Sequence, residues 1–178
     1  DDLEIPTGEV GEFAVKGRQV SRAYYGRDDA TELAKIADPD GGFWHRMGDV
    51  GYVDEQGRLW FCGRKAHRVR LESETLYSLQ CEGVFNCHPA VYRTALVGVE
   101  RDGHTLPVLC VELLANRPAD HPVDRARTEA ELRAIAAGNE RTRSIETFLF
   151  HSDFPVDIRH NAKIFREKLA VWATRQLS

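Results

Sequence analysis

Two short, aromatic-rich runs separated by a polar turn constrain the fold of this chain more than any other feature. The first run lies within residues 42–52 and the second within residues 58–65, with Asp-Glu-Gln-Gly between them at 54–57. Apolar runs that flank a glycine-containing turn are typical of a β-hairpin. The sequence therefore predicts two antiparallel strands joined by this turn.

Two glycine-bordered corners of the predicted hairpin carry opposite charges. Asp49 follows Gly48, and Arg64 follows Gly63. A carboxylate can accept two hydroxyl hydrogens, and a planar guanidinium can donate two parallel hydrogen bonds. Such a pair would suit a ribose diol, so we expect Asp49 and Arg64 to bind a nucleotide. The alternatives are a turn or capping carboxylate for Asp49 and an interdomain salt bridge for Arg64.

The same stretch resembles the ATP-dependent adenylate-forming superfamily, which includes acyl- and aryl-CoA ligases, luciferases and the adenylation domains of peptide synthetases. That family has a block of Arg, Thr, Gly-Asp, an apolar residue and Gly, followed by a second block that ends in Gly-Arg. The first block matches residues 46–51, with Met47 in place of the usual Thr, and the second matches residues 54–64. The resemblance implies that Asp49 and Arg64 hold the ribose of ATP.

Lys163 lies in a further block of this resemblance, near the end of the chain. The family pattern is an apolar residue and Pro, a short loop, Gly-Lys and then Arg, which Pro155, Lys163 and Arg166 match here. The resemblance implies that Lys163 is the catalytic lysine, which bridges the substrate carboxylate and the α-phosphate. Without the resemblance, it would be a surface lysine in the first turn of a helix. Arg159 and His160 are further candidates for placing positive charge near the phosphates.

Departures from the family pattern bear on the second half of the reaction. Ala66 stands where the family has an Asp or Lys hinge, and Ser73 stands where it has a glycine that approaches the CoA thiol. Since glycine is used where a backbone must approach a ligand closely, a side chain at Ser73 should narrow that path. These departures, with Arg-His-Asn-Ala-Lys at 159–163, resemble the branch in bacterial long-chain olefin biosynthesis that closes a β-hydroxy acid to a β-lactone.

The resemblance implies an ATP-dependent ligase that forms an acyl-adenylate and releases pyrophosphate, with ATP and Mg²⁺ as cofactors. In this interpretation, a long-chain β-hydroxy acid then becomes a β-lactone in olefin biosynthesis, and other enzymes of that pathway are expected partners. A fatty acyl-CoA ligase is the first alternative. The second alternative is a non-catalytic module that binds a nucleotide or a protein partner.

The hydrophobic pattern predicts a mostly β first part and an α+β second part. In the first part, we expect a strand over 11–15, a helix over 28–37 and the hairpin. The second part should contain helices over 76–86 and 161–176, a helix that starts at a capping box over 128–131, strands over 91–99, 106–114 and 144–150, and a polar loop over 116–127.

The predicted fold class is therefore α+β, with two bodies. By the resemblance, residues 1–65 are the C-terminal portion, a β subdomain, of a large N-terminal domain. Residues 66–178 would be a small mobile lid domain with a three-stranded sheet and helices, hinged near Lys65 and Ala66. The chain does not begin with Met and lacks the phosphate loop and acyl pocket that the family carries upstream, so we expect a piece that is inactive alone.

Composition argues against several other classes. The formal charge of −4 and the scattered Lys and Arg give no basic face for nucleic acid. No apolar run reaches the roughly 18 residues of a transmembrane helix, and we expect a cytoplasmic protein. The cysteines lack zinc-ligand spacing, so the sequence predicts reduced thiols and no metal site; they are Cys62, Cys81, Cys87 and Cys110.

Overall fold

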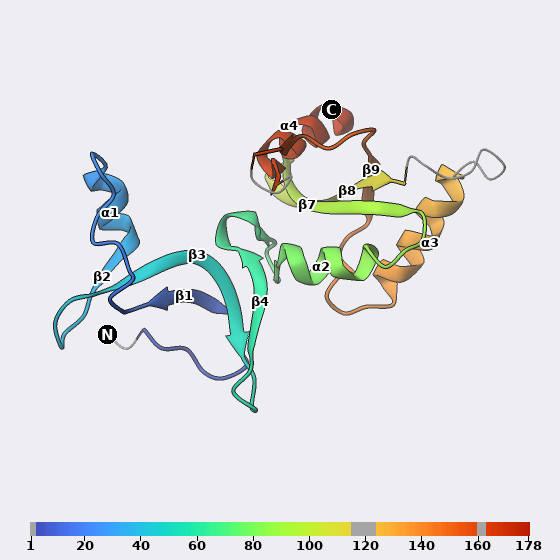
Figure 1. Ribbon diagram of the computed structural model, residues 1–178. Helices are drawn as coiled ribbons and strands as arrows, with labels where there is room; N and C mark the ends of the chain where they lie inside the picture. The colour runs from blue at the N-terminus through green and yellow to red at the C-terminus, as the bar shows by residue number, and fades with distance from the viewer. Residues whose placement is uncertain (1–2, 115–123, 160–162) are drawn as a thin grey trace. The chain divides into compact units, whose positions relative to one another are not determined.

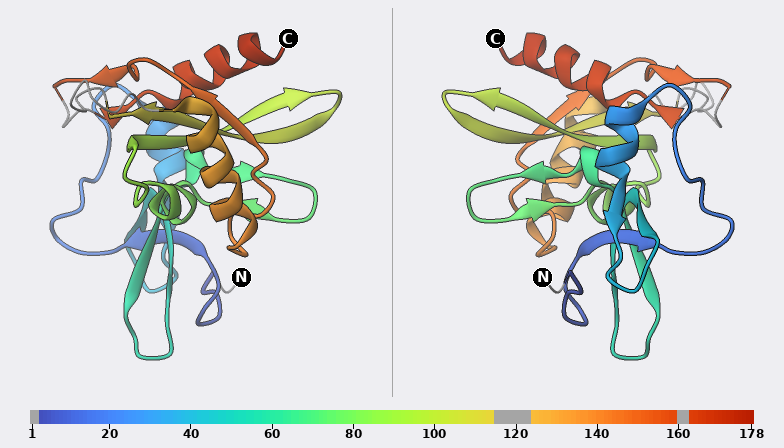
Figure 2. Two further views of the ribbon diagram at one scale, coloured as in Figure 1. Left: turned by 90° about the vertical axis from the view of Figure 1, so that its right-hand side faces the viewer. Right: turned by 90° about the vertical axis from the view of Figure 1, so that its left-hand side faces the viewer.

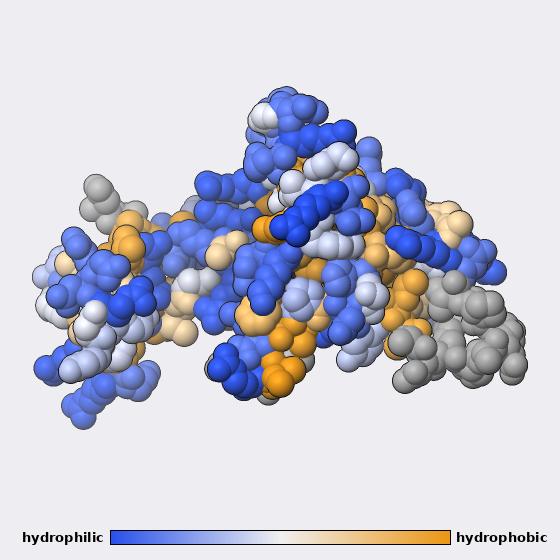
Figure 3. All heavy atoms as spheres, turned by 90° about the horizontal axis from the view of Figure 1, so that it is seen from above, coloured by the Kyte–Doolittle hydropathy of each residue, from blue (hydrophilic) through white to orange (hydrophobic). Residues whose placement is uncertain are grey.

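The computed structural model describes residues 3–114, 124–159 and 163–178. The chain forms two compact units, Asp1–Ala66 (unit 1) and His67–Ser178 (unit 2), each with its own sheet (Figures 1 and 2). The face drawn in Figure 3 is mostly hydrophilic, with small apolar patches between the charged side chains. In the part of the chain that the structure describes, no helix is long and apolar enough to cross a membrane.

Unit 1 is built on a four-stranded antiparallel sheet in which β3 pairs with all the other strands. Its elements are β1 (Gly11–Val15), α1 (Asp28–Ala34), β2 (Lys35–Ala37), β3 (Phe43–Val53) and β4 (Leu59–Arg64). The predicted hairpin is therefore confirmed. The predicted helix over 28–37 is too long, because its last three residues leave the helix and pair with the start of β3.

The turn between β3 and β4 is fixed by the side chain of Asp54. Its Oδ1 accepts hydrogen bonds from the backbone N–H groups of Gln56 (3.0 Å) and Arg58 (2.9 Å). Its Oδ2 accepts from the indole N–H of Trp60 at 2.7 Å. An aspartate that bonds its own backbone two residues on is a common way to hold a turn, and here it sets where β4 begins.

Gly51 lies at the most crowded point of the unit 1 sheet. A Cβ added there would lie 2.2 Å from the carbonyl oxygen of Trp60 and 2.3 Å from Cζ of Phe13. Both distances are far inside van der Waals contact, and one of the neighbours is backbone. The Gly-Asp-Val-Gly run therefore needs its second glycine for close packing of the strands.

A carboxylate in β1 joins four segments of unit 1. Glu12 Oε2 accepts hydrogen bonds from Arg46 Nη2 (2.6 Å) and Nε (3.2 Å), and from Lys65 Nζ (2.6 Å). The same Arg46 donates from Nη1 to the carbonyl of Leu33, at the end of α1. Burial alone would raise the pKa of Glu12, but the hydrogen bonds from Arg46 and Lys65 outweigh it and hold that pKa below its usual value.

Unit 2 is built on a three-stranded sheet in the order β7-β8-β9. β7 (Val91–Arg101) and β8 (His104–Leu113) are antiparallel, and β9 (Thr147–Phe150) runs parallel to β8. The structure thus has a strand at each of the three places where the sequence predicts one. Asp102 and Gly103, which join β7 to β8, both have positive φ, as in the tightest class of hairpin turn.

Helices cover both faces of this sheet (Figure 1). α2 (Ser78–Phe85) and α3 (Arg125–Ala137) pack on one face around Leu96, Leu109 and Phe148. α4 (Arg166–Leu177) packs on the other, with Leu169 and Ala173 against alternate residues of β7 and β8. The remaining elements are η1 (Lys65–His67), the pair β5 (Val69–Arg70) with β6 (Thr75–Leu76), and the pair β10 (Val156–Asp157) with β11 (Lys163–Ile164).

The helices of unit 2 begin at other residues than the sequence predicts. α3 begins three residues before the predicted capping box, because Asp124 is its N-cap and accepts from the backbone N–H of Arg127 at 3.0 Å. Thr128 is instead buried inside the helix. The predicted helix over 161–176 begins only at Arg166, since the preceding residues form β11. Residues 116–123 of the predicted polar loop lie outside the described residues, and the prediction is wrong for residues 125–127, which belong to α3.

The four cysteines are free thiols. Cys62, Cys81 and Cys110 are buried, whereas Cys87 is exposed. Burial raises the pKa of Cys81 and that of Cys110 to about 12. Within the described ranges, no group of three His, Cys, Asp or Glu side chains is placed to hold a metal ion.

The network around Glu12 predicts acid sensitivity. Because the folded-state pKa of Glu12 lies below its unfolded value, its contribution to the free energy of unfolding is present above pH about 4.5 and is lost as the pH falls below it. Glu12→Gln should therefore be less stable than the parent chain at pH 7, and this difference should shrink on acidification to about pH 3. Urea unfolding across this pH range measures it.

Glu9→Gln removes one exposed carboxylate of the same unit and is the matched control for the loss of a negative charge. A stability difference for Glu12→Gln that stays constant with pH would contradict the prediction.

Candidate functional site

Asp49 and Arg64 are directly opposite each other in the ladder between β3 and β4. Nε of Arg64 lies 3.1 Å from Oδ1 of Asp49, and Nη1 of Arg64 donates to the carbonyl of Met47 at 3.0 Å. The structure therefore brings together the two residues that the sequence predicts for ribose binding. We call these two residues the corner pair.

The corner pair is placed by the glycines that precede each member. Gly48 has φ of +69° and Gly63 has φ of +119°, a left-handed backbone region that side chains disfavour. The ladder between β3 and β4 is irregular immediately afterwards, between Val50 and Gly51. A glycine thus precedes each member of the corner pair because the backbone there adopts a conformation that other residues disfavour.

One oxygen of the Asp49 carboxylate is buried without a hydrogen bond. Oδ1 is inaccessible to solvent, and no donor among the described residues reaches it with hydrogen-bond geometry. Its contact with Arg64 is thus an ion pair by distance rather than an aligned hydrogen bond. A buried polar atom of this kind is a candidate for a missing partner. The Arg64 side chain that contacts it is 51% exposed.

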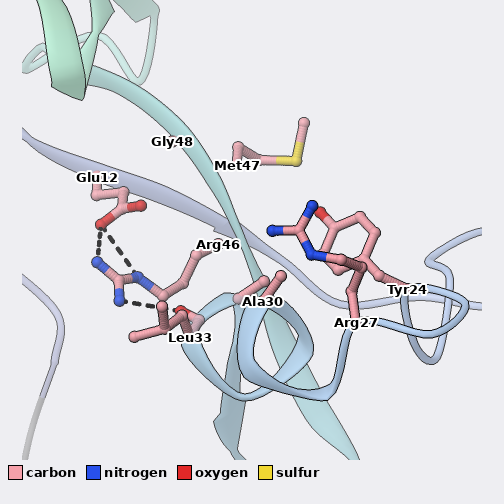
Figure 4. Close-up of a pocket in the computed structure, with 9 residues that line it drawn as sticks. Glu12, Tyr24, Arg27, Ala30, Leu33, Arg46, Met47 and Gly48 are labelled. Carbon is pink, nitrogen blue, oxygen red and sulfur yellow. Dashed lines mark hydrogen bonds and ion pairs between the residues drawn. The ribbon is translucent and has the colours of Figure 1, made fainter.

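An open groove of about 640 Å³ lies in unit 1, and neither residue of the corner pair lines it (Figure 4). Met47 and Gly48, which directly precede Asp49, form part of its wall, and so do Arg46 and Glu12. The other lining residues are Tyr24, Arg27, Ala30, Leu33 and Ala34. The groove therefore combines apolar walls with Arg27 and with the ion pair between Glu12 and Arg46.

Sequence reasoning did not find Glu12. Arg46 belongs to the recognised block, but its ion-pair partner lies 34 positions earlier in the chain. The alternation of side chains along β1 could have suggested on which face of the sheet Glu12 lies. That pattern does not identify Arg46 as its partner.

Lys163 lies in unit 2, where it occupies β11 opposite Asp157 of β10. The expectation that it begins a helix is wrong, because backbone pairing with β10 keeps residues 163–164 extended and α4 starts at Arg166. Its side chain is exposed. Arg159 is bonded to Asp157 through its backbone N–H (3.0 Å) and Nε (3.3 Å). The candidate His160 lies outside the described residues.

The two positions that depart from the family pattern are both exposed. Ala66 lies in η1, at the end of unit 1, and Ser73 lies in the bend between β5 and β6. The side chain at Ser73 is therefore on the surface of unit 2.

Comparison with known proteins supports the resemblance. No protein-family model matches the chain. The chain is 52% identical over 189 residues to an olefin beta-lactone synthetase of Xanthomonas campestris pv. campestris, which covers 99% of this chain and 34% of that protein. It is 53% identical over 177 residues to an olefin beta-lactone synthetase of Stenotrophomonas maltophilia, which covers 97% of this chain and 31% of that protein. The chain thus spans about a third of the length of these curated relatives.

Among solved structures, the O-succinylbenzoate coenzyme A synthetase of Bacillus subtilis in complex with AMP is similar to the chain. The TM-score is 0.72 at 25% identity, and the match covers 93% of this chain and 31% of that one. The resemblance drawn from residues 46–64 and from the Lys163 block is therefore confirmed at the level of the family. The chain is a relative of the adenylate-forming enzymes, homologous over nearly its whole length to about one third of the olefin beta-lactone synthetases.

Proposed function

We propose that the chain is part of an ATP-dependent enzyme that activates a carboxylate as its acyl-adenylate and releases pyrophosphate. We further propose that a long-chain β-hydroxy acid is the substrate and that its hydroxyl then attacks the activated carbonyl, which yields a β-lactone and AMP. The corner pair is the observation that carries this proposal, in a chain 52% identical to an olefin beta-lactone synthetase. Other olefin-pathway enzymes as partners and a cytoplasmic location belong to the same proposal.

In this proposal, the corner pair binds the ribose of ATP. The hydroxyls of the sugar would donate to Asp49, whose buried Oδ1 has no hydrogen-bond donor among the described residues. Arg64 would move aside from that oxygen and donate to the sugar or to the phosphate. Its half-exposed side chain leaves room for this rotation.

The proposed role of Lys163 is to neutralise charge during adenylation. The substrate carboxylate attacks the α-phosphorus of ATP, and the oxygen that bridges to pyrophosphate leaves with its electron pair. Such a transfer depends mainly on positioning and on charge stabilisation. An ammonium is a compact, mobile point charge suited to this task, and Lys163 presents one at the surface of unit 2.

We propose that residues 1–65 are a β subdomain and that residues 66–178 are a mobile lid that delivers Lys163. The boundary between two compact units at Ala66 and His67 supports this division, because such units are expected to move relative to each other. The described residues hold no group of three His, Cys, Asp or Glu side chains suited to a metal ion. We propose Mg²⁺ as the ion that accompanies ATP and assign it no ligand among these described residues.

Asp49→Asn in the complete enzyme should weaken ATP binding. The substitution keeps the shape of the side chain but removes the charge that accepts the ribose hydroxyls, so we expect the KM for ATP to rise about tenfold. Asp40→Asn is the control, because Asp40 is an exposed aspartate of the same unit and its loss should leave that KM unchanged. ATP–pyrophosphate exchange in the presence of the carboxylic acid substrate measures the KM of both variants. An equal rise in KM in the two variants would argue against ribose binding at Asp49.

Lys163→Ala should lower the rate of acyl-adenylate formation about 100-fold or more, since it removes a charge aimed at the transition state. AMP binding should be retained. Lys168→Ala removes a second exposed lysine from the same region and should have little effect. An unchanged exchange rate in Lys163→Ala would favour the alternative of a non-catalytic binding module.

The products distinguish β-lactone synthesis from the alternative of a fatty acyl-CoA ligase. The similarity to a coenzyme A synthetase keeps that alternative open. With ATP, Mg²⁺ and a long-chain β-hydroxy acid, we expect a β-lactone and AMP whether or not CoA is present. Mass spectrometry of the products provides the measurement, and a thioester formed only when CoA is added would favour the ligase.

A further inference from the structure

Two buried carboxylates of unit 2 have no place in the proposed chemistry. Glu82 in α2 is 3% exposed and Glu112 in β8 is 7% exposed. Glutamate is almost never fully buried unless it is paired. Each of these two accepts hydrogen bonds from an arginine and from one backbone N–H group. These partners identify the segments that each carboxylate connects.

Glu82 connects the open edge of the sheet to the start of α4. Its Oε1 accepts from the backbone N–H of Leu96 at 2.9 Å, in the edge strand β7. Arg166, the first residue of α4, donates from Nη2 to Oε2 at 2.6 Å and from Nε to Oε1 at 3.2 Å. This is a bidentate arginine–carboxylate pair, the geometrically most specific kind of ion pair.

Glu112 connects the sheet to the segment that directly precedes β10. Its Oε2 accepts from Nε of Arg93, the residue directly opposite in β7, at 2.7 Å. The same oxygen accepts from the backbone N–H of Phe154 at 2.9 Å. Phe154 is buried against the sheet, and the guanidinium of Arg93 lies over its ring, 5.4 Å from the centroid.

The strand pair that carries Lys163 lies between these two anchors. The backbone N–H of Phe165 donates to the carbonyl of Pro155 at 2.9 Å, and Val156 then pairs with Ile164 and Asp157 with Lys163. A pair of two-residue strands is too short to be stable alone. Glu112 fixes the residue that precedes this ladder, and Glu82 fixes the residue that follows it.

We propose that Glu82 and Glu112 are positioning residues for Lys163. They anchor the two ends of the β10–β11 pair to the sheet, so that the ammonium is held at one place on the surface of unit 2. The inference depends on the role of Lys163 proposed above. Since a displacement of about 1 Å at a reacting group can cost about 100-fold in rate, loosening either anchor should slow adenylation without weakening the binding of ATP.

The test is a double-mutant cycle in the complete enzyme. Glu82→Gln and Glu112→Gln each keep the shape of the side chain and an acceptor for the backbone N–H, but lose the charge that orders the arginine. Each should lower kcat for ATP–pyrophosphate exchange about tenfold and change the KM for ATP less than about twofold. In a Lys163→Ala background, each should lower the residual rate less than about twofold, because the group they position is gone.

A structural readout and a matched control accompany the cycle. Hydrogen–deuterium exchange should speed up in peptides that contain β10 and β11 in both glutamine variants. Thr142→Val is the control: Thr142 is also fully buried in unit 2, and its hydroxyl donates to the carbonyl of Ala136 at the end of α3. It should change neither kcat nor exchange in β10 and β11. If Glu82→Gln does not fold, Arg166→Lys loosens the same anchor with the charge retained.

The possible outcomes separate this inference from the proposed function. An unchanged rate in Lys163→Ala itself would overturn the role of Lys163. If that variant is slow but the glutamine variants have parental kcat, the positioning role is wrong. Equal fold losses in the parent and Lys163→Ala backgrounds would also overturn it, because the glutamates would then act without Lys163.

Discussion

The antiparallel register between β3 and β4 is the constraint on which the corner pair depends. In a strand, a slip of one residue turns every side chain to the opposite face, so Asp49 faces Arg64 in only one register. The turn after β3 sets that register through Asp54, whose backbone N–H donates to the carbonyl of Arg58 at 2.9 Å. Gly51 lies so close to the carbonyl of Trp60 that no side chain fits at that position. The ribose site proposed at the corner pair thus depends on backbone geometry more than on the two charges.

Unit 2 contains a buried ion pair between Glu82 and Arg166. Burial raises the pKa of the Glu82 carboxyl, although the Arg166 guanidinium opposes the shift. Replacing such a pair by apolar residues is often neutral or stabilising, so its presence is weak support for a stabilising role. A bidentate pair does restrict how α4 can lie on the sheet. We therefore interpret Glu82 and Arg166 as determinants of position at the start of α4.

The parts that the sequence predicts well are local ones. The hairpin, its turn and the meeting of Asp49 with Arg64 all lie within about twenty residues, where alternation and turn chemistry suffice. The sequence places Lys163 in a helix because the residues after it have helical spacing. Its partner strand, β10, is too short to be recognised from a hydrophobic pattern. The partner of Arg166 lies 84 positions away. Periodicity shows that a position is buried, but it does not identify which distant carboxylate meets which arginine.

The uneven exposure of the four thiols has a practical consequence. Alkylating reagents react with accessible thiolates, and burial with a raised pKa protects Cys81 and Cys110. A maleimide dye would therefore attach to this chain at Cys87 without removal of any other cysteine. Cys87 follows α2, the helix that carries Glu82. A fluorophore there would test whether unit 2 moves during turnover, by energy transfer to a second label elsewhere in the enzyme.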